Sequence, residues 1–413
     1  METLFLEKDL SHAVDIIRNG GLVAVPTETV YGLACNGLDE AAVERVYAVK
    51  GRPAVKAMSL LVAGADAIDR YCADVPPGAY ALANNFWPGP LTIVLRSRGK
   101  EPPIVRAGGE NVGLRCPDHP LTGELLRRCC VPLAAPSANL SGAPPLTSAA
   151  EVFSCFKGKI DAVLEGGRSE LGEASTVLDM SGTPYRVLRA GALPEAKIWD
   201  TLRENLLLIG LTGGSGGGKT TALRVLENMG ALVIDADEVY HELTRTSAEM
   251  REELTARFGA VYDGAALDRK KLGALVFSDG AALSDLNAIT HKYVNAEIDR
   301  LLTEHVKHGG TVAAIDAIGL LESPYAKKTL CNVAVTAPLE ERLRRLTARD
   351  GIGADAARAR IKAQKSDAYF EENCDTVLRN EGDRETFEKQ CTNYFTEVLK
   401  KYNGRKNGQE REQ

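Results

Sequence analysis

Short apolar runs alternate with amphipathic stretches in the first half of the chain. Residues 10–18 have the spacing of an amphipathic helix, the Asn19-Gly20-Gly21 turn ends it, and residues 22–25 form a short buried strand. Further apolar runs that predict strands occur at 58–62, 91–95, 112–114, 131–134, 162–164 and 176–178. Helical stretches separate these runs, which predicts an α/β or α+β domain.

The second half repeats one simple alternation. An apolar run at 206–209 precedes a glycine-rich loop, and a helix over 219–229 follows before another strand at 231–234. Later strands are expected at 311–315 and 331–335. Strands that alternate with helices predict a parallel sheet covered on both faces.

These patterns divide the chain into two domains. We expect one domain over 1–195, a linker over 196–205, a second domain over 206–400 and a polar, disordered tail over 401–413. We see no leader segment and no membrane span, which predicts a cytoplasmic protein.

Charge and cysteine usage exclude some classes. The 50 basic and 56 acidic side chains give a net charge of −6, and neither half has a basic excess. Strong direct binding of nucleic acid through bulk charge is therefore not expected. The nine cysteines form no C-x-x-C pair and are interpreted as reduced packing residues.

Residues 213–220 match the phosphate-loop pattern G-x-x-x-x-G-K-T between a strand and a helix. Backbone N–H groups here can point at the phosphates of ATP, Lys219 can bridge the β- and γ-phosphates, and the Thr220 hydroxyl can ligate Mg²⁺. The predicted ATP-binding residues are Gly214, Ser215, Gly216, Gly217, Gly218, Lys219, Thr220 and Thr221.

Two further positions suggest phosphoryl transfer. Asp235 and Asp237 follow the strand predicted beside the phosphate loop, where a carboxylate can accept a hydroxyl proton; helix capping is the alternative. Arg349 follows a basic helix in a segment suited to a kinase lid, and a solvated helix face is the alternative.

Residues 208–382 resemble the dephospho-CoA kinase family in motif order. The matching segments are 209–220, 233–238, 257–259, 267–277, 315–323, 345–352, 357–364 and 377–383. The resemblance implies a P-loop kinase with substrate-binding helices and a lid, which phosphorylates the 3′-hydroxyl of dephospho-CoA with ATP and Mg²⁺. It assigns catalysis to Lys219, Asp235 and Arg349. Departures at His291-Lys292 and over 316–322 affect positions expected to contact the substrate.

The first half has no phosphate loop but several polar clusters. Residues 26–33 place hydroxyls, a carboxylate and a phenol after a buried strand, and Lys50, Arg52 and Lys56 lie within seven residues of one another. Three cations so close suit a polyphosphate, although favourable charges at a helix C-terminus are the alternative. Residues 136–142 add a polar turn.

With 172–176 and 188–191, these segments resemble the YrdC-type threonylcarbamoyl-AMP synthase family. The resemblance implies a twisted mixed sheet with helices and a reaction of L-threonine, bicarbonate and ATP, whose product passes to a tRNA threonylcarbamoyl-transfer complex. It assigns ATP contacts to Lys50, Arg52, Lys56, Ser137, Asn139 and Arg189, and threonine contacts to Thr29 and Ser175. The chain lacks the D-N-P-L segment and later histidine of many members.

The combined prediction is a bifunctional enzyme with two independent ATP sites. Two alternatives stay open at this point. The first half could be a non-catalytic RNA- or nucleotide-binding module, and the kinase could use another small hydroxyl acceptor.

Overall fold

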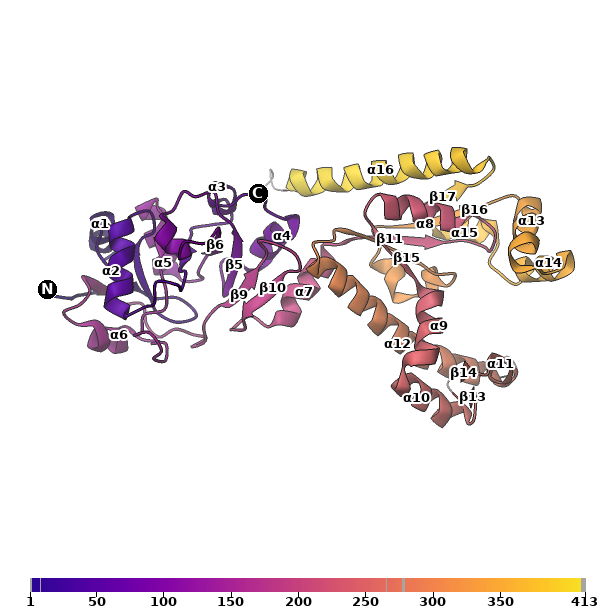
Figure 1. Cartoon of the computed structure of the whole chain (residues 1–413), viewed down its shortest axis with the longest axis horizontal. Coiled ribbons are helices and arrows are strands. Elements are labelled where there is room, and N and C mark those ends of the chain that lie inside the picture. The colour runs from indigo at the N-terminus through magenta and orange to yellow at the C-terminus, as the bar shows by residue number, and fades with distance from the viewer. Residues whose placement is uncertain (1, 8, 265, 277–278, 410–413) are drawn as a thin grey trace. The chain divides into compact units, whose positions relative to one another are not determined.

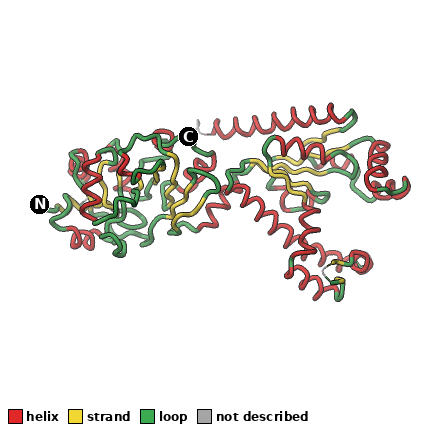
Figure 2. Tube along the Cα trace, in the orientation of Figure 1, coloured by secondary structure: helices red, strands yellow, loops and turns green. Residues whose placement is uncertain are grey.

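The computed structural model describes residues 2–7, 9–264, 266–276 and 279–409, with side chains described up to residue 402. The chain divides into two compact units. Unit 1 comprises Met1–Asn205 with Lys307–Gly309, and unit 2 comprises Leu206–Val306 with Gly310–Gln413. Figure 1 labels the elements, and Figure 2 shows strands gathered within each unit among helices and loops.

Unit 1 is built on one mixed sheet of ten strands in the order β1-β8-β2-β3-β7-β4-β6-β5-β9-β10. Parallel and antiparallel pairs alternate irregularly across it, as the resemblance implied. The strands are β1 (Leu4–Leu6), β2 (Val23–Val25), β3 (Gly32–Asn36), β4 (Ser59–Leu61), β5 (Leu91–Arg96), β6 (Asn111–Arg115), β7 (Leu133–Ala134), β8 (Ala162–Leu164), β9 (Thr176–Asp179) and β10 (Arg186–Arg189).

Helices of unit 1 cover this sheet through their apolar sides. In α1, Asp9 caps the helix by accepting a 3.1 Å bond from the His12 N–H, while Val14 and Ile17 are buried. The helices are α1 (Leu10–Arg18), α2 (Glu40–Lys50), α3 (Ala67–Tyr71), α4 (Pro77–Phe86), α5 (Pro120–Cys129), α6 (Ala149–Phe156), α7 (Glu195–Glu204) and the 3₁₀ turn η1 (Pro103–Arg106).

Unit 2 contains a parallel five-stranded sheet in the order β12-β15-β11-β16-β17. The parallel sheet confirms the predicted fold class. Its strands are β11 (Leu207–Thr212), β12 (Leu232–Asp235), β15 (Val312–Asp316), β16 (Cys331–Thr336) and β17 (Thr376–Arg379). The short hairpin of β13 (Tyr262–Asp263) and β14 (Ala266–Leu267) lies outside this sheet.

The core of unit 2 lies where α8 and α16 pack on the sheet, around the buried rings of Phe387 and Phe395. The helices are α8 (Lys219–Asn228), α9 (Ala236–Thr246), α10 (Ala248–Phe258), α11 (Arg269–Val276), α12 (Gly280–Lys307), α13 (Leu339–Asp350), α14 (Ala354–Lys362), α15 (Asp367–Asn373) and α16 (Arg384–Gln409), with 3₁₀ turns η2 (Leu320–Glu322) and η3 (Pro324–Lys327).

Two segments are helical: the expected linker, whose conformation the sequence left open, and most of the tail that was expected to be disordered. Most of the expected linker 196–205 is helix α7, because Ile198, Trp199 and Leu202 are buried and α7 packs on α4 within unit 1. Helix α16 continues through Gln409 into the expected tail, whose last four residues lie outside the described part of the chain. None of the described helices has the length and apolarity to cross a membrane.

Candidate nucleotide and substrate sites

The glycine-rich loop of unit 2 connects β11 to α8 in a conformation that needs glycine. Gly213, Gly216 and Gly218 have φ values of 127°, 79° and 114°. A Cβ on Gly218 would lie 2.2 Å from the Asn380 Nδ2 atom, and one on Gly213 would lie 2.2 Å from the Val335 carbonyl oxygen. Side chains at these positions would therefore displace the loop from its supports.

Residues far along the chain hold the outer side of this loop. The buried Arg342 donates from Nε to the Ser215 carbonyl at 3.1 Å. Gln364 accepts from the Ser215 N–H at 2.8 Å and donates to the Ser215 hydroxyl at 2.7 Å. Asn380 donates to the Gly217 carbonyl at 3.0 Å. The sequence analysis missed these supports, since no local pattern marks them.

The inner side of the loop faces a cavity of about 610 Å³. Lys219 enters it with Nζ 3.1 Å from the Gly213 carbonyl oxygen and 3.9 Å from Asp316 Oδ1. The described residues that line it are Gly214, Ser215, Gly216, Gly217, Gly218, Lys219, Thr220, Asp235, Asp237, Asp316, Ile318, Arg344, Arg345, Leu346, Ala348, Arg349 and Arg360. All predicted kinase residues except Thr221 thus come together.

The strand order corrects one expectation about this site. β15, and not β12, pairs with β11 on the side that leads to Asp235, so the strand beside the phosphate loop ends at Asp316. Asp316 is 8% exposed and its Oδ1 atom makes no hydrogen bond with the described residues. Burial raises the pKa of Asp316 to about 7, Lys219 opposes this rise, and Asp235 and Asp237 add to it.

Asp235 caps a helix and also lines the phosphate cavity. Its Oδ1 atom accepts the Asp237 and Glu238 N–H groups at 2.9 and 3.1 Å and so caps α9. The same residue lines the phosphate cavity, which leaves its carboxylate within reach of a ligand there.

Arginines of α13 and α14 also line this cavity. Arg345 donates to the Gly216 and Gly217 carbonyls at 3.1 and 3.3 Å. The exposed Arg349 forms a fork with its neighbour Asp350, which also accepts from Arg360 at 2.9 Å. Arg349 and Arg360 therefore share one carboxylate at the edge of the cavity.

The oxygen donors of this cavity fit Mg²⁺. The Thr220 hydroxyl and the carboxylates of Asp235 and Asp316 line it and are hard oxygen donors, and the buried Asp316 Oδ1 atom has no hydrogen bond within the described residues. Within the described residues, no three His, Cys, Asp or Glu side chains form a metal cluster.

Unit 1 holds a separate cavity of about 450 Å³, lined by residues of β4, β5, β6, β9 and β10 and of nearby loops. Four arginines line it, namely Arg52, Arg106, Arg115 and Arg189, together with Ser137 and Ser175. Of the predicted ligand contacts, Arg52, Ser137, Ser175 and Arg189 line this cavity. Thr29, Lys50, Lys56 and Asn139 are not among its lining residues.

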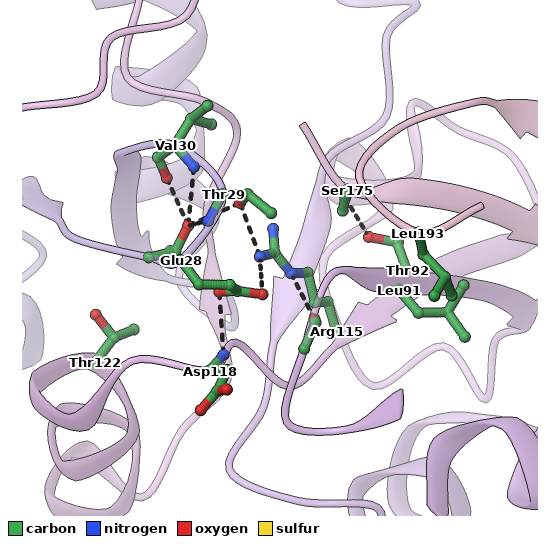
Figure 3. A network of polar contacts seen from close by, with 12 residues as sticks. Glu28, Thr29, Val30, Leu91, Thr92, Arg115, Asp118, Thr122, Ser175 and Leu193 are labelled. Carbon is green, nitrogen blue, oxygen red and sulfur yellow. Dashed lines mark hydrogen bonds and ion pairs between the residues drawn. The ribbon is translucent and has the colours of Figure 1, made fainter. Parts of the chain in front are cut away.

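A buried ion pair orders one wall of the cavity (Figure 3). Arg115 donates from Nη2 to Glu28 Oε1 and to the Thr29 hydroxyl, both at 2.8 Å. Glu28 Oε2 accepts the Asp118 N–H at 3.1 Å. Arg115 and Glu28 are 7% and 6% exposed, so removing either would leave a buried charge unpaired. Sequence analysis missed Arg115, because it ends an ordinary apolar strand.

Ser175 connects two other elements of the same cavity. Its hydroxyl lies 2.9 Å from that of Thr92 on β5, as Figure 3 shows. Arg189 on β10 donates to the Ser175 carbonyl at 2.7 Å and to its hydroxyl at 3.0 Å. This contact holds the Arg189 guanidinium at the cavity.

The cations of the Lys50–Lys56 segment separate in space. Lys50 is 3% exposed and its ammonium donates to the carbonyl oxygens of Ser137 and Asn139. Burial and the nearby Arg52 lower the pKa of Lys50 to about 8. Arg52 donates to the Lys56 and Ala57 carbonyls at 3.0 and 2.6 Å, while the Lys56 side chain is exposed. Lys50 thus supports the turn that carries Ser137.

The fold and sites define a protein of two nucleotide-enzyme units. Residues 15–191 match the family model of Sua5, YciO and YrdC, described as telomere recombination, and residues 207–386 match the model of dephospho-CoA kinase. Each match lies within one unit.

Curated relatives agree with this division. A threonylcarbamoyl-AMP synthase of Pyrococcus abyssi is 42% identical over 46% of this chain and 56% of its own length. That of Chromohalobacter salexigens is 34% identical over 43% of this chain and 96% of its own length. A dephospho-CoA kinase of Thermobifida fusca is 32% identical over 48% of this chain and 100% of its own length.

The chain belongs to the threonylcarbamoyl-AMP synthase family through unit 1 and to the dephospho-CoA kinase family through unit 2. Both predicted resemblances are confirmed, and both are enzyme families. The chain spans little more than half the length of the first synthase relative above.

Proposed function

We propose that unit 2 transfers the γ-phosphoryl group of ATP to the 3′-hydroxyl of dephospho-CoA. This proposal rests on the observation that the phosphate loop, Asp235 and the arginines of α13 and α14 line one cavity. The acceptor oxygen attacks the γ-phosphorus, and the bond between the γ-phosphorus and the bridging oxygen of ADP breaks. The proton of the acceptor hydroxyl passes to Asp235.

Charge placement supports this step. Loop N–H groups and Lys219 receive the β- and γ-phosphates, and Arg349 and Arg360, which line the same cavity, balance negative charge there. Thr220 and Asp316 would hold Mg²⁺, which neutralises phosphate charge when bound, and Asp235 stays available to accept the proton. The three residues proposed as catalytic are therefore Lys219, Asp235 and Arg349.

We propose that unit 1 joins L-threonine, bicarbonate and ATP to form threonylcarbamoyl-AMP and pyrophosphate. This proposal rests on the observation that four arginines and Ser175 line the same cavity. The threonine amine adds to bicarbonate with loss of water, and the resulting carbamate oxygen attacks the α-phosphorus while pyrophosphate leaves. Arg52 and Arg189 suit the phosphates, because they line the cavity with donors free of carboxylate partners in the described chain.

The threonine contacts are proposed at Ser175 and Thr29, and the two residues act differently. Ser175 offers a hydroxyl to the cavity, whereas Thr29 acts through its bond to Arg115. Lys50 and Asn139 are proposed to position the Ser137 turn, since their polar groups bond within it. The contact of Lys56 with ATP stays a prediction.

Two assays on the intact chain test these proposals. With ATP and dephospho-CoA, we expect CoA and ADP; with ATP, threonine and bicarbonate, we expect pyrophosphate release that needs both small substrates. ATP hydrolysis without phosphorylation of dephospho-CoA would indicate another acceptor. A folded chain that binds nucleotide without releasing pyrophosphate would indicate a binding module. The cytoplasmic location and transfer of the product to a tRNA-modifying complex are proposed from family membership.

A further inference from the structure

Asp235 lines a second cavity besides the one that faces the phosphate loop. This cavity of about 420 Å³ lies between β12, α9 and α12. Because Asp235 is common to both, a molecule in the second cavity can present a hydroxyl to Asp235 while ATP occupies the first. The second cavity is therefore placed to receive part of the phosphoryl acceptor.

The lining of this cavity selects against phosphate. Three half-buried apolar side chains, Val239 and Leu243 of α9 and Leu301 of α12, form an apolar wall. Three glutamates, Glu238, Glu242 and Glu297, also line the cavity. No lysine, arginine or histidine is among the described lining residues. The negative charge of a diphosphate would be repelled by these carboxylates. An uncharged ring with a hydrogen-bond donor could pack on the apolar side chains and donate to a carboxylate.

The three glutamates differ in what they already bind. Glu242 pairs with Arg245, and Glu297 pairs with Arg300 at 2.7 Å. Glu238 makes no ion pair or side-chain hydrogen bond within the described residues. Its carboxylate is therefore the one available to accept a bond from a ligand.

We propose that this cavity holds the adenine of the acceptor nucleotide, with its exocyclic amine donating to Glu238. The inference rests on the proposed kinase function. In dephospho-CoA the reacting hydroxyl belongs to a ribose that carries adenine on one side and the diphosphate on the other. Only the adenine is uncharged and directly attached to that ribose, so the acidic cavity beside Asp235 receives adenine and the diphosphate points away from it.

This placement makes Glu238 a specificity determinant. An analogue with hypoxanthine presents a carbonyl oxygen where adenine presents an amine, and that oxygen would face a carboxylate. We expect the wild-type chain to prefer dephospho-CoA over its hypoxanthine analogue by about tenfold in kcat/KM, the size expected for one charge-assisted bond at a partly exposed site.

The test compares wild type with Glu238→Gln and with Glu252→Gln, an exposed glutamate of α10 that lines neither cavity. The glutamine amide can donate to the hypoxanthine oxygen, so Glu238→Gln should reduce the preference to about threefold or less and leave the KM for ATP unchanged. Glu252→Gln should retain the wild-type preference. Calorimetric binding of both acceptors to the full chain gives a second readout that does not require turnover.

The outcomes separate the two proposals. If wild type phosphorylates dephospho-CoA but Glu238→Gln and wild type show the same preference, the adenine assignment is wrong and the kinase function stands. If wild type neither binds nor phosphorylates dephospho-CoA, the kinase proposal fails and the assignment fails with it. A rise in the KM for ATP in Glu238→Gln would place the ATP base there and also overturn the assignment.

Discussion

Asp316 illustrates how a functional carboxylate costs stability. It is 8% exposed, its Oδ1 atom has no hydrogen bond within the described residues, and Lys219 lies 3.9 Å away. Because burial raises its pKa to about 7, the folded chain holds this proton more tightly than the unfolded chain. Stability from this group is present at low pH and is lost as pH rises from about 4 to about 7.

We therefore expect Asp316→Asn to stabilise unit 2 above pH 7. The amide keeps the shape and removes the buried charge, and a gain of about 1–2 kcal/mol is expected at pH 8. Kinase kcat should fall by at least about tenfold, because the carboxylate is proposed to help hold Mg²⁺. Thermal unfolding between pH 4 and 8, following the transition that dephospho-CoA shifts, measures the first effect. Equal stability of the two proteins at pH 8 would contradict it.

Lys50 supports a different residue-scale prediction. Its ammonium donates to the Ser137 and Asn139 carbonyls, so Lys50→Met should leave two carbonyl groups without that donor and loosen the turn. We expect a loss of about 1–3 kcal/mol in the stability of unit 1 and a synthase rate reduced by tenfold or more. Lys56→Met is the control, because its side chain is exposed; loss of stability there would argue against this interpretation.

At the scale of elements, the segment from α13 to Gln364 has two parts, of which one contacts the phosphate loop and the other does not. Near the loop, Arg342, Arg345 and Gln364 bond to backbone atoms of 215–217. Farther away, Arg349 is exposed and, within the described residues, pairs only with its neighbour Asp350. The first part shapes the loop, whereas the second has the freedom expected of a group that closes on phosphate.

Gln364→Ala tests the loop support. Removing two bonds to Ser215 should loosen the loop and raise the KM for ATP by about three- to tenfold, with the KM for the acceptor little changed. Gln390→Ala, an exposed glutamine of α16, is the matched control and should behave as wild type. Steady-state kinetics with each substrate varied in turn measures the effect. An unchanged KM for ATP in Gln364→Ala would show that the loop keeps its shape without this support.

Elements with strong local patterns were predictable, and their order in the sheet was not. The strands predicted at 91–95 and 112–114 correspond to β5 and β6. They could be predicted because a continuous apolar run between two turns is visible in the local sequence. The position of β15 between β11 and β12 depends on packing across the sheet, so Asp316 was missed as a neighbour of Lys219. Helix α7 was expected only as a connection because its apolar face became evident only against α4.

The same limit applies to the sites. Phosphate-loop residues follow one another in sequence, so their clustering could be predicted from spacing. Arg115 bonds to Glu28 and Thr29, which lie 86 or more positions earlier in the sequence, and no local pattern predicts that contact. Lys50 and Lys56 are close in sequence, yet one is buried in a turn and the other exposed, because helix α2 ends at Lys50 and the chain reverses.

At the scale of the whole molecule, each candidate site is built wholly from one unit. The described residues that line the phosphate cavity all belong to unit 2, and those of the arginine-lined cavity all belong to unit 1. The two proposed reactions share ATP as a substrate but share no product. Nothing in the chemistry requires that one site sense the other, so the two activities should respond separately to substitution.

Lys219→Ala and Arg52→Ala provide the reciprocal test in the intact chain. Removing Lys219 takes away the cation at the β- and γ-phosphates, so kinase kcat should fall by about 100-fold or more while threonine-dependent pyrophosphate release is unchanged. Removing Arg52 takes one guanidinium from the other cavity, so pyrophosphate release should fall by at least about tenfold while CoA formation is unchanged. Thermal unfolding of both variants controls for misfolding. If either substitution lowered both activities in a folded chain, the sites would be coupled and the independence argued from their separate linings would be wrong.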